Sequence, residues 1–415
     1  MTGTSIPASW TLLPLKELGD WSGGGTPSKA KPQYWQGGTI PWVSPKDMKT
    51  ERISDSEDHI TKEAISHSAT SLINAGSVLI VTRSGILRHT LPVAVSSVAV
   101  TVNQDLKALT PRNGIMAEYV AWALRAFGRD ILNTCSKQGT TVNSVETSKL
   151  LSFEIPVAPT EQQRSIVAEI EKQFSRLDEA VASLKRTKAN LKRYKAAVLK
   201  AAVEGKLAPT EMPWKQTELG NIAASIRNGY SKKPDAEQGT RIFRISAVRP
   251  MELDPVDVRY LPGVSSDYAL FLVGPGDVLF TRYNGSRDYV GVCAKVPASL
   301  PPTVYPDKLI RVRLPESILL PEFLVILAST GRARQYIESK IRTTAGQSGI
   351  SGGDLKSLPL DIPRVEEQRQ IVSEVERRLS VIHELESTVE ANLTRAERLR
   401  HAILGQAFAG SLGTP

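Results

Sequence analysis

The sequence is poor in the residues that most often form cross-links and metal sites. Among its 415 residues are two cysteines, Cys135 and Cys293, and five histidines that lie far apart. Two cysteines make no disulfide framework, so we expect a reducing, cytoplasmic setting. No Cys/His spacing suits zinc, and we therefore expect no metal site in this chain.

Long hydrophobic runs are also missing. The longest, residues 91–102, is interrupted by Pro92 and three polar residues, and it is too short to span a bilayer. The first ten residues, MTGTSIPASW, contain no basic segment followed by an apolar core. We therefore expect neither a signal peptide nor a membrane partner.

The common catalytic motifs do not occur. There is no G-x-x-x-x-G-K-[ST] phosphate loop, and Gly23–Gly25 lacks the G-x-G-x-x-G pattern of dinucleotide sites. The tetrapeptide N/D-P-P-F/Y of amino-methyltransferases is missing, and no Pro-Asp pair is followed by a convincing nuclease motif. A catalytic site dispersed along the chain would leave no such motif. The absences favour a binding subunit with no catalytic residues and no cofactor of its own.

The charge is strongly positive. The formal net charge is +9 and the isoelectric point about 9.4. Such a balance favours an anionic partner, most commonly nucleic acid. Many proteins are mildly basic without such a partner, so the charge leaves both interpretations open.

An internal repeat indicates how the chain is organised into domains. The segment EQQRSIVAEI at residues 161–170 returns as EEQRQIVSEV at residues 366–375. The similarity continues without a gap from 161–207 to 366–412, with 15 of 47 positions identical. A repeat at this distance, in a chain too long for one ordinary domain, indicates a duplicated module.

Each copy of the repeat predicts a long helix. Apolar residues recur in steps of three and four, a proline precedes each copy (Pro159, Pro363), and a glycine ends each copy (Gly205, Gly410). The predicted apolar stripes are Ile166, Ile170, Phe174, Leu177, Val181, Leu184, Leu191, Tyr194, Val198 and Ala201, and Ile371, Val375, Leu379, Ile382, Leu385, Val389, Leu393, Ala396, Leu399, Ile403 and Ala407. We expect the two stripes to cover each other in an intramolecular antiparallel coiled coil. The alternative is two separate helices, each packed on its own globular domain.

The segments between the helices have a different character. They are rich in Gly, Pro, Val and Ile, as expected for mixed α/β domains with many short strands. They also echo each other, as in GSVLIVTRSG (76–85) and GDVLFTRYNG (276–285). The predicted fold class is α+β, with two globular mixed α/β domains (1–155 and 208–360) separated by the two-helix antiparallel coiled coil of residues 156–207 and 361–415, in a pseudo-two-fold internal duplication. Diverged domains on a retained scaffold suggest two similar tasks with different targets.

Four segments resemble one known family. SGGGTPSKAKPQYWQGGTIPWVSPKDM (22–48) resembles the first target-recognition domain of type I restriction–modification specificity subunits. IPVAPTEQQRSIVAEI (155–170) and LDIPRVEEQRQIVSEV (360–375) resemble the beginnings of the family's two conserved helical regions, and LKAAVEGKLAP (199–209) resembles a helix exit. The resemblance covers essentially the whole chain. The second globular domain departs from the first, because it has the sequence GTRIFRISAV (239–248) in place of the family-like sequence that ends segment 22–48 of the first domain.

The resemblance implies a non-catalytic DNA-recognition subunit of a phage-defence system. It would bind double-stranded DNA and assemble with two modification (methyltransferase) subunits and with restriction (helicase-nuclease) subunits. The complex would methylate adenine with S-adenosylmethionine and would cut unmodified DNA with ATP and Mg. Each target-recognition domain would read one half of a bipartite, asymmetric site. Two alternatives are a coiled-coil scaffold or regulator with two ligand-binding modules and no methyltransferase partner, and a standalone methyltransferase or nuclease.

Sequence readout needs polar side chains that reach base edges, on loops supported by strands. The candidates in the first domain are Trp42, Ser44, Lys46, Asp47, Arg83, Ser84, Arg88, Gln138, Thr140, Thr141 and Asn143. Those in the second are Arg244, Ser246, Arg282, Tyr283, Asn284, Arg287, Arg342, Thr343, Gln347 and Ser348. For each of them the alternative is a solvated loop charge or a turn-capping group.

The first helix is also more basic than the second. Residues 161–207 carry a net charge of +5, whereas residues 366–412 carry −2. The excess forms a stripe of candidate phosphate contacts: Lys185, Arg186, Lys188, Lys192, Arg193 and Lys195. The alternative is a solvated face or pairing with acids of the partner helix.

Overall fold

The computed structural model describes residues 6–137, 143–208, 212–344 and 346–412. The chain forms two compact units. Unit 1 comprises Met1–Leu184 and Ala391–Pro415, and unit 2 comprises Lys185–Glu390. Each unit therefore contains one globular part and one half of each long helix.

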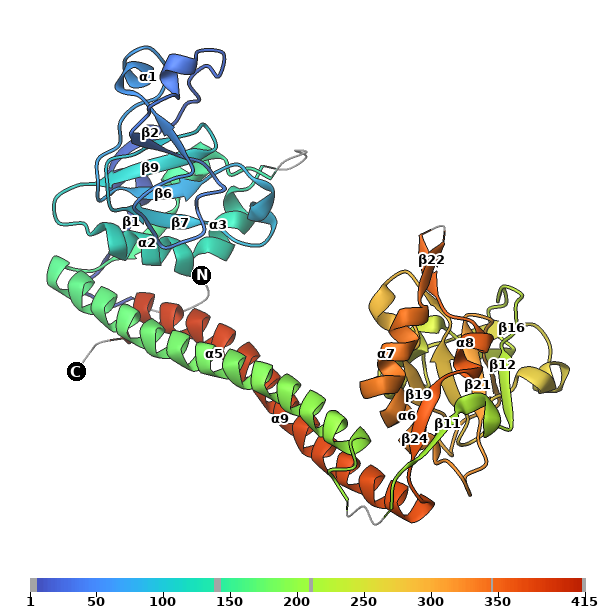
Figure 1. Ribbon diagram of the computed structural model, residues 1–415. Helices are drawn as coiled ribbons and strands as arrows, with labels where there is room; N and C mark the ends of the chain where they lie inside the picture. Colours follow the sequence, from blue (N-terminus) through green and yellow to red (C-terminus); the bar gives the residue numbers. More distant parts are fainter. Residues whose placement is uncertain (1–5, 138–142, 209–211, 345, 413–415) are drawn as a thin grey trace. The chain divides into compact units, whose positions relative to one another are not determined.

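The globular part of unit 1 is built on a five-stranded sheet with the order β2-β9-β6-β7-β4. Its strands are β1 (Thr11–Pro14), β2 (Gly19–Gly23), β3 (Ile40–Val43), β4 (Arg52–Ile53), β5 (Asp58–Ile60), β6 (Val78–Val81), β7 (Val93–Ser96), β8 (Thr101–Val102), β9 (Leu106–Pro111) and β10 (Glu154–Val157). Its helices are η1 (Leu15–Glu17), η2 (Pro32–Tyr34), α1 (Lys62–Ser66), η3 (Gly85–Arg88), α2 (Ala117–Ala126), α3 (Gly128–Cys135) and α4 (Thr147–Ser152). All four residues of β6 are buried, as expected for a central strand covered by α2 (Figure 1).

A second, smaller sheet with the order β5-β3-β8 carries its own core of Tyr34, Trp42, Ile60 and Ala64. The strands β1 and β10 pair antiparallel with each other, so the first strand of the unit lies beside the strand that leads into the first long helix. The globular part thus has a main sheet, a small sheet and a two-stranded base next to the helix.

Unit 2 repeats this plan. Its strands are β11 (Lys215–Glu218), β12 (Ser225–Asn228), β13 (Thr240–Phe243), β14 (Val248–Arg249), β15 (Glu252–Leu253), β16 (Val258–Leu261), β17 (Val278–Thr281), β18 (Tyr283–Asn284), β19 (Cys293–Lys295), β20 (Thr303–Val304), β21 (Leu309–Arg313), β22 (Arg342–Thr344), β23 (Gln347–Gly349) and β24 (Pro359–Ile362). Its helices are η4 (Leu219–Asn221), η5 (Ile245–Ala247), η6 (Ser265–Phe271), η7 (Arg287–Tyr289), α6 (Pro321–Ser329), α7 (Gly331–Lys340) and α8 (Gly352–Lys356).

The sheet orders of unit 2 match those of unit 1. The order β12-β21-β17-β19 corresponds to β2-β9-β6-β7, and β16-β13-β20 corresponds to β5-β3-β8. The pair β11–β24 corresponds to β1–β10. The predicted internal duplication is confirmed, and it extends through the globular parts, where few side chains are shared.

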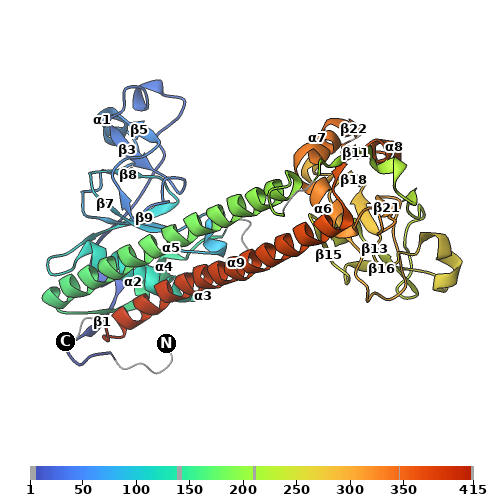
Figure 2. The ribbon, with the colours of Figure 1, turned by 60° about the horizontal axis from the view of Figure 1, so that its bottom comes forward.

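The two long helices are α5 (Thr160–Val203) and α9 (Val365–Phe408). In unit 1, Asp178 of α5 forms an ion pair with Arg400 of α9, and in unit 2, Lys188 lies 2.6 Å from Glu390. Later residues of α5 thus face earlier residues of α9, so the predicted antiparallel pairing is confirmed (Figure 2). The alternative also holds in part, because Ile166, Ile170 and Ile403 belong to the main core of unit 1.

The predicted stripes need correction at three positions. Tyr194, Leu385 and Leu399 are 47, 45 and 47% exposed. The residues buried between the two long helices form the seam of the coiled coil. In unit 2 they recur every seven positions along the helix, as Leu191 and Val198 do. A two-helix interface covers only a narrow face, so positions three residues beyond a seam residue fall at its edge. No described helix is both long and apolar enough to cross a membrane.

Candidate nucleic-acid interface

Two loops that were predicted separately meet in unit 1. The amide of Val145 donates to the Thr82 carbonyl at 2.8 Å, and the amide of Ser84 donates to the Asn143 carbonyl at 3.0 Å. The Arg88 Nε lies 3.4 Å from the Asn143 Oδ1. The end of β6 and the segment before α4 therefore form one surface, which we call paired-loop surface 1 (residues 82–88 and 143–145).

Paired-loop surface 1 lies beside a basic hollow. A cavity of about 560 Å³ is lined by Arg83, Lys107 and Lys137, with no acidic side chain among its lining residues. Arg83 is 60% exposed at its side chain, and its Nε lies 2.9 Å from the Asp105 Oδ1. Asp105 thus orients the guanidinium group, while the cavity keeps a positive potential suited to an anionic ligand.

The corresponding loops of unit 2 form a three-stranded sheet with the order β18-β23-β22. Tyr283 pairs with Gly349 and Asn284 with Ser348. The amide of Ile350 donates to the Arg282 carbonyl at 3.0 Å. This is paired-loop surface 2 (residues 282–287, 342–344 and 346–350), and Figure 1 shows its strand β22 projecting from the rest of the globular part.

The two surfaces share one backbone framework but not their side chains. Thr82 and Arg282 each donate an amide to the loop that follows the small sheet, to Asp105 and Lys308 respectively, at 2.7 and 2.8 Å. The equivalent pairs are Thr82/Arg282, Arg83/Tyr283, Ser84/Asn284, Asp105/Lys308, Asn143/Ser348 and Ser144/Gly349. Every pair combines two different residue types, so equivalent points on the two surfaces offer different chemistry.

The remaining candidates of paired-loop surface 2 are partly engaged with the protein. The Arg282 guanidinium lies 4.6 Å from the ring centre of Tyr283, and Arg287 donates to the Glu338 carbonyl at 3.1 Å. The hydroxyl groups of Thr343 and Ser348 are hydrogen-bonded at 3.0 Å. Arg342 is 79% exposed at its side chain and lies 3.9 Å from Asp354.

The structure corrects the predictions for the loop at residues 42–47. Trp42 is buried in the core of the small sheet, and its Nε1 donates to the Gly25 carbonyl at 2.9 Å. Ser44 is buried, and its amide and hydroxyl both donate to Asp47 Oδ2 at 2.8 and 2.9 Å. Lys46 is paired with Asp58 and Glu57 at 2.9 and 3.2 Å. Trp42 and Ser44 thus anchor a core and a turn and are not available as base contacts, whereas Lys46 remains exposed within its ion pairs.

Two candidates of the second globular part are engaged in the same way. The Arg244 Nε lies 3.6 Å from Asp257, and the Ser246 hydroxyl donates to the same carboxylate. Both side chains are exposed, but both bind Asp257, so they connect the η5 segment to the residue that precedes β16. Gln138, Thr140 and Thr141 lie outside the described residues.

The basic stripe of α5 is exposed and partly paired. Lys188 is bound to Glu390, and the Nζ of Lys195 lies 3.4 Å from a ring nitrogen of His383. Lys185, Arg186 and Lys192 are exposed and have no ion pair with any described residue. The alternative of pairing with the partner helix therefore holds for Lys188, whereas phosphate contact stays a prediction for the accessible cations.

Sequence reasoning missed four polar residues beside the paired-loop surfaces: Gln104, Lys107 and Lys137 in unit 1, and Lys308 in unit 2. The Lys308 Nζ lies 3.4 Å from the Gln347 Oε1 of the β22–β23 hairpin. No local pattern marks these residues, because they reach the surface through strand pairing between segments far apart in the sequence.

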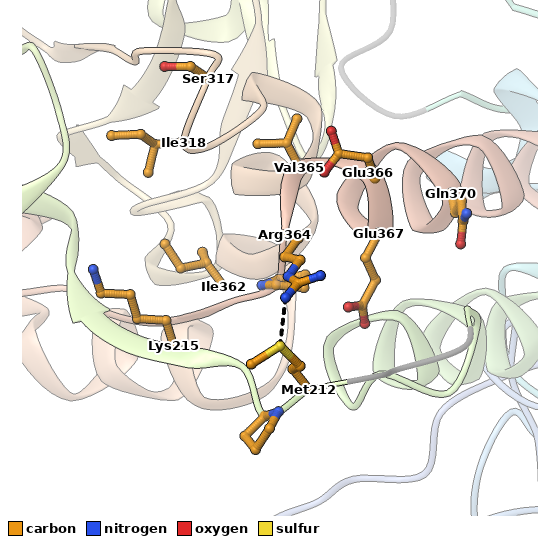
Figure 3. A pocket seen from close by; sticks show the side chains of 12 residues that line it. Met212, Lys215, Ser317, Ile318, Ile362, Arg364, Val365, Glu366, Glu367 and Gln370 are labelled. Atoms are coloured by element: carbon orange, nitrogen blue, oxygen red, sulfur yellow. Dashed lines mark hydrogen bonds between the residues drawn. The ribbon is translucent and has the colours of Figure 1, made fainter.

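A further cavity of about 740 Å³ lies at the beginning of α9 in unit 2 (Figure 3). Its charged lining residues are Lys215, Arg364, Glu366 and Glu367, and the Arg364 guanidinium donates to the Met212 sulfur. This balanced charge does not favour DNA. Among the residues described, no group of three or more metal-ligating side chains occurs.

Residues 7–193 match the family model described as the type I restriction modification DNA specificity domain. The chain is 36% identical over 66% of its length to the type I restriction enzyme EcoKI specificity subunit of Escherichia coli (strain K12), of which it covers 61%. It is 47% identical over 38% of its length to the Escherichia coli EcoR124I/EcoR124II specificity subunit, of which it covers 39%. The chain thus spans less than two thirds of these relatives.

Solved structures share the fold along the whole chain. One is a chain from a study of complex assembly and conformational transition of the type I R-M system, with a TM-score of 0.76 and 19% identity. It is matched over 98% of this chain and 100% of that chain. Another is the HsdS subunit from Thermoanaerobacter tengcongensis, with a TM-score of 0.63, 19% identity and 98% coverage of both chains.

Proposed function

We propose that this chain is the DNA-recognition subunit of a type I restriction–modification complex, because it is similar in sequence and in fold to specificity subunits of such systems. Each globular part reads one half of a bipartite, asymmetric site. The observation that carries the proposal is the pair of paired-loop surfaces, which share a backbone framework and differ in residue type at the six equivalent positions compared above. A shared framework gives the same approach to DNA, and different donors and acceptors select different bases.

The chemistry of the two surfaces suits two different half-sites. Surface 1 offers Arg83, Arg88 and Asn143 next to a basic cavity. Arginine pairs well with guanine, and asparagine with adenine, in the major groove. Surface 2 offers Arg342, Gln347 and Asn284 on a narrow hairpin sheet. The β22–β23 hairpin within this sheet is a two-stranded ribbon, an element that fits the major groove.

The repeated helix beginnings provide two similar docking sites for two identical methyltransferase subunits. Glu161 pairs with Arg164 at 2.6 Å, and Glu366 pairs with Arg369 at 3.7 Å, all four with strongly exposed side chains. The same charged pattern is thus displayed on both long helices. Restriction subunits would join the complete complex.

The chain itself is non-catalytic in this proposal. S-adenosylmethionine for adenine methylation, and ATP with Mg for restriction, are bound by the partner subunits. The accessible cations of α5, such as Lys185, Arg186 and Lys192, contact phosphates of the DNA between the half-sites.

Methylome sequencing of the host tests the function. With the gene present, one split motif with methylated adenine in both halves is expected, and deletion of the gene should remove methylation of that motif only. An unchanged methylome in the deletion strain would contradict the proposal. Purified chain incubated with labelled S-adenosylmethionine and duplex DNA should show no methyl transfer, and turnover by the chain alone would contradict its non-catalytic role.

A further inference from the structure

Both globular parts contain a lysine-proline segment at the same place in the fold. The segments are Ser28–Pro32 (SKAKP) and Ser231–Pro234 (SKKP). Each follows the first strand of the main sheet, β2 or β12, and precedes the central strand of the small sheet, β3 or β13. We call them lysine segments 1 and 2.

Hydrogen bonds show that the backbone leading into the two segments is equivalent in the two units. Just before lysine segment 1, the amide of Gly25 donates to the Val102 carbonyl at 3.0 Å, and just before lysine segment 2, the amide of Tyr230 donates to the Tyr305 carbonyl at 2.9 Å. The residues before these, Gly24 and Gly229, pass so close to the opposite backbone that an added Cβ would lie 2.1 and 2.2 Å from a carbonyl oxygen. Glycine at these two positions therefore has a steric reason.

The four lysines of the two segments are exposed. Lys29, Lys31, Lys232 and Lys233 form no ion pair with any described residue. In segment 1 the side chains rest on aromatic groups, with the Nζ of Lys29 5.9 Å from the Trp35 ring centre and the Nζ of Lys31 3.1 Å from the Tyr34 hydroxyl. These contacts hold the ammonium groups at the surface without neutralising them.

Each lysine segment begins beside the paired-loop surface of its own unit. The Thr26 hydroxyl donates to the Gln104 Oε1 at 2.5 Å, and Gln104 lines the cavity that contains Arg83. In unit 2 the amide of Asp307 donates to the Tyr230 carbonyl at 2.8 Å, and the Asp307 carbonyl accepts from Arg282 at 3.3 Å.

Chain length limits how far the lysines lie from the surfaces. Lys29 follows Thr26 by three residues and Lys232 follows Tyr230 by two, which is at most about 10 Å of extended chain. The major groove is about 12 Å wide between its flanking phosphates. Lys29, Lys232 and Lys233 are thus within reach of the backbone of a DNA duplex whose bases contact the paired-loop surface, and Lys31 follows Lys29 by two residues.

We propose that lysine segments 1 and 2 bind the phosphodiester backbone of DNA beside each half-site, whatever its sequence. The proposal rests on the proposed DNA-recognition function. Its basis is that both units carry two exposed lysines, without an ion pair to any described residue, in the segment that follows the equivalent glycines, although the lysines do not occupy equivalent positions. Phosphate contacts position a reader but carry no sequence information, so two readers with different targets can share them.

The two segments differ in their surroundings. No acidic residue occurs between Asp20 and Asp47, whereas Asp235 and Glu237 closely follow lysine segment 2. These carboxylates oppose the approach of phosphate. Segment 1 therefore contributes more to DNA affinity than segment 2.

Binding of the full chain, together with its modification subunits, to duplexes with and without the recognised motif tests the proposal. For K29A/K31A, the slope of log K against log salt should become shallower by about 1.8, since each lost phosphate contact contributes about 0.9. Affinity for both duplexes should fall by the same factor, and the methylated motif should stay the same. K232A/K233A should have a smaller effect in the same direction.

The matched control is K49A/K62A, which removes the same charge from exposed positions of the same globular part. Its salt slope should change by less than half as much. A slope for K29A/K31A equal to that of the control would overturn the inference while leaving the proposed function intact. An altered base preference would also overturn it, because it would make the lysines base contacts. Absence of DNA binding by the wild-type complex would overturn both the proposed function and the inference.

Discussion

Gln163 and Gln368 make the same three hydrogen bonds in the two units. Their Oε1 atoms accept from the amides of Met116 and Leu320, both at 2.9 Å. The Nε2 of Gln163 donates to the carbonyls of Gly114 and Ala158, and the Nε2 of Gln368 donates to those of Ile318 and Pro363. Both side chains are almost fully buried, at 1 and 0% exposed. Each glutamine thereby joins the first turn of a long helix to the residue that precedes α2 or α6.

Replacing Gln368 by Met should therefore destabilise unit 2. The methionine has a similar length but leaves the Leu320 amide and two carbonyls without a partner, and a buried unsatisfied polar group costs about 1–3 kcal/mol. Calorimetry should show the unfolding transition of unit 2 lowered by roughly 5 °C or more. Gln370→Met, two residues away and exposed, is the control and should leave the transition unchanged. Equal transitions for the two variants would refute the role assigned to Gln368.

The paired-loop surfaces predict effects confined to one half-site. Arg83→Ala should weaken recognition of the half read by unit 1, and Arg342→Ala that read by unit 2, each by about 1–3 kcal/mol for a base contact. Competition between duplexes mutated in either half measures this directly. Lys46→Ala removes a cation that is already paired with Asp58 and should alter neither half. If Arg83→Ala and Arg342→Ala impaired the same half, the assignment of one reader to each unit would be wrong.

The helix seam predicts different responses at two neighbouring positions of α9. Val389 is 5% exposed and Leu385 is 45% exposed. Val389→Asp buries an unpaired charge and should lower the stability of unit 2 by about 3 kcal/mol or more. Leu385→Asp should change it by less than about 0.5 kcal/mol. Chemical denaturation of both variants measures the difference, and similar losses would contradict the seam.

The long helices and the duplication could be predicted from the sequence because their signals are local or periodic. The step of three and four, the prolines before each helix and the retained Gln163/Gln368 pattern all lie within short windows. The outward position of Tyr194 could not be predicted in this way, because an apolar residue at the edge of a stripe looks the same as one in the seam.

The candidate interface was harder to predict for a physical reason. Ser84 and Asn143 are 59 residues apart and meet only through the pairing of two loops. Pro41 and Pro45 suggested an accessible loop at Trp42 and Ser44, yet Trp42 lies in β3 and the polar atoms of both residues are bound within the protein. Sequence shows which residue types a loop carries, whereas the tertiary hydrogen bonds decide which of them are left for a ligand.

Exchange of one globular part tests the central claim most directly. Residues 208–358 are replaced by the equivalent segment of a family member with a different target, and the methylated motif is determined in cells by methylome sequencing. If each globular part reads its own half-site, one half of the motif should change to that of the donor while the other half stays the same. A change in both halves, or an active complex with an unchanged motif, would contradict the claim.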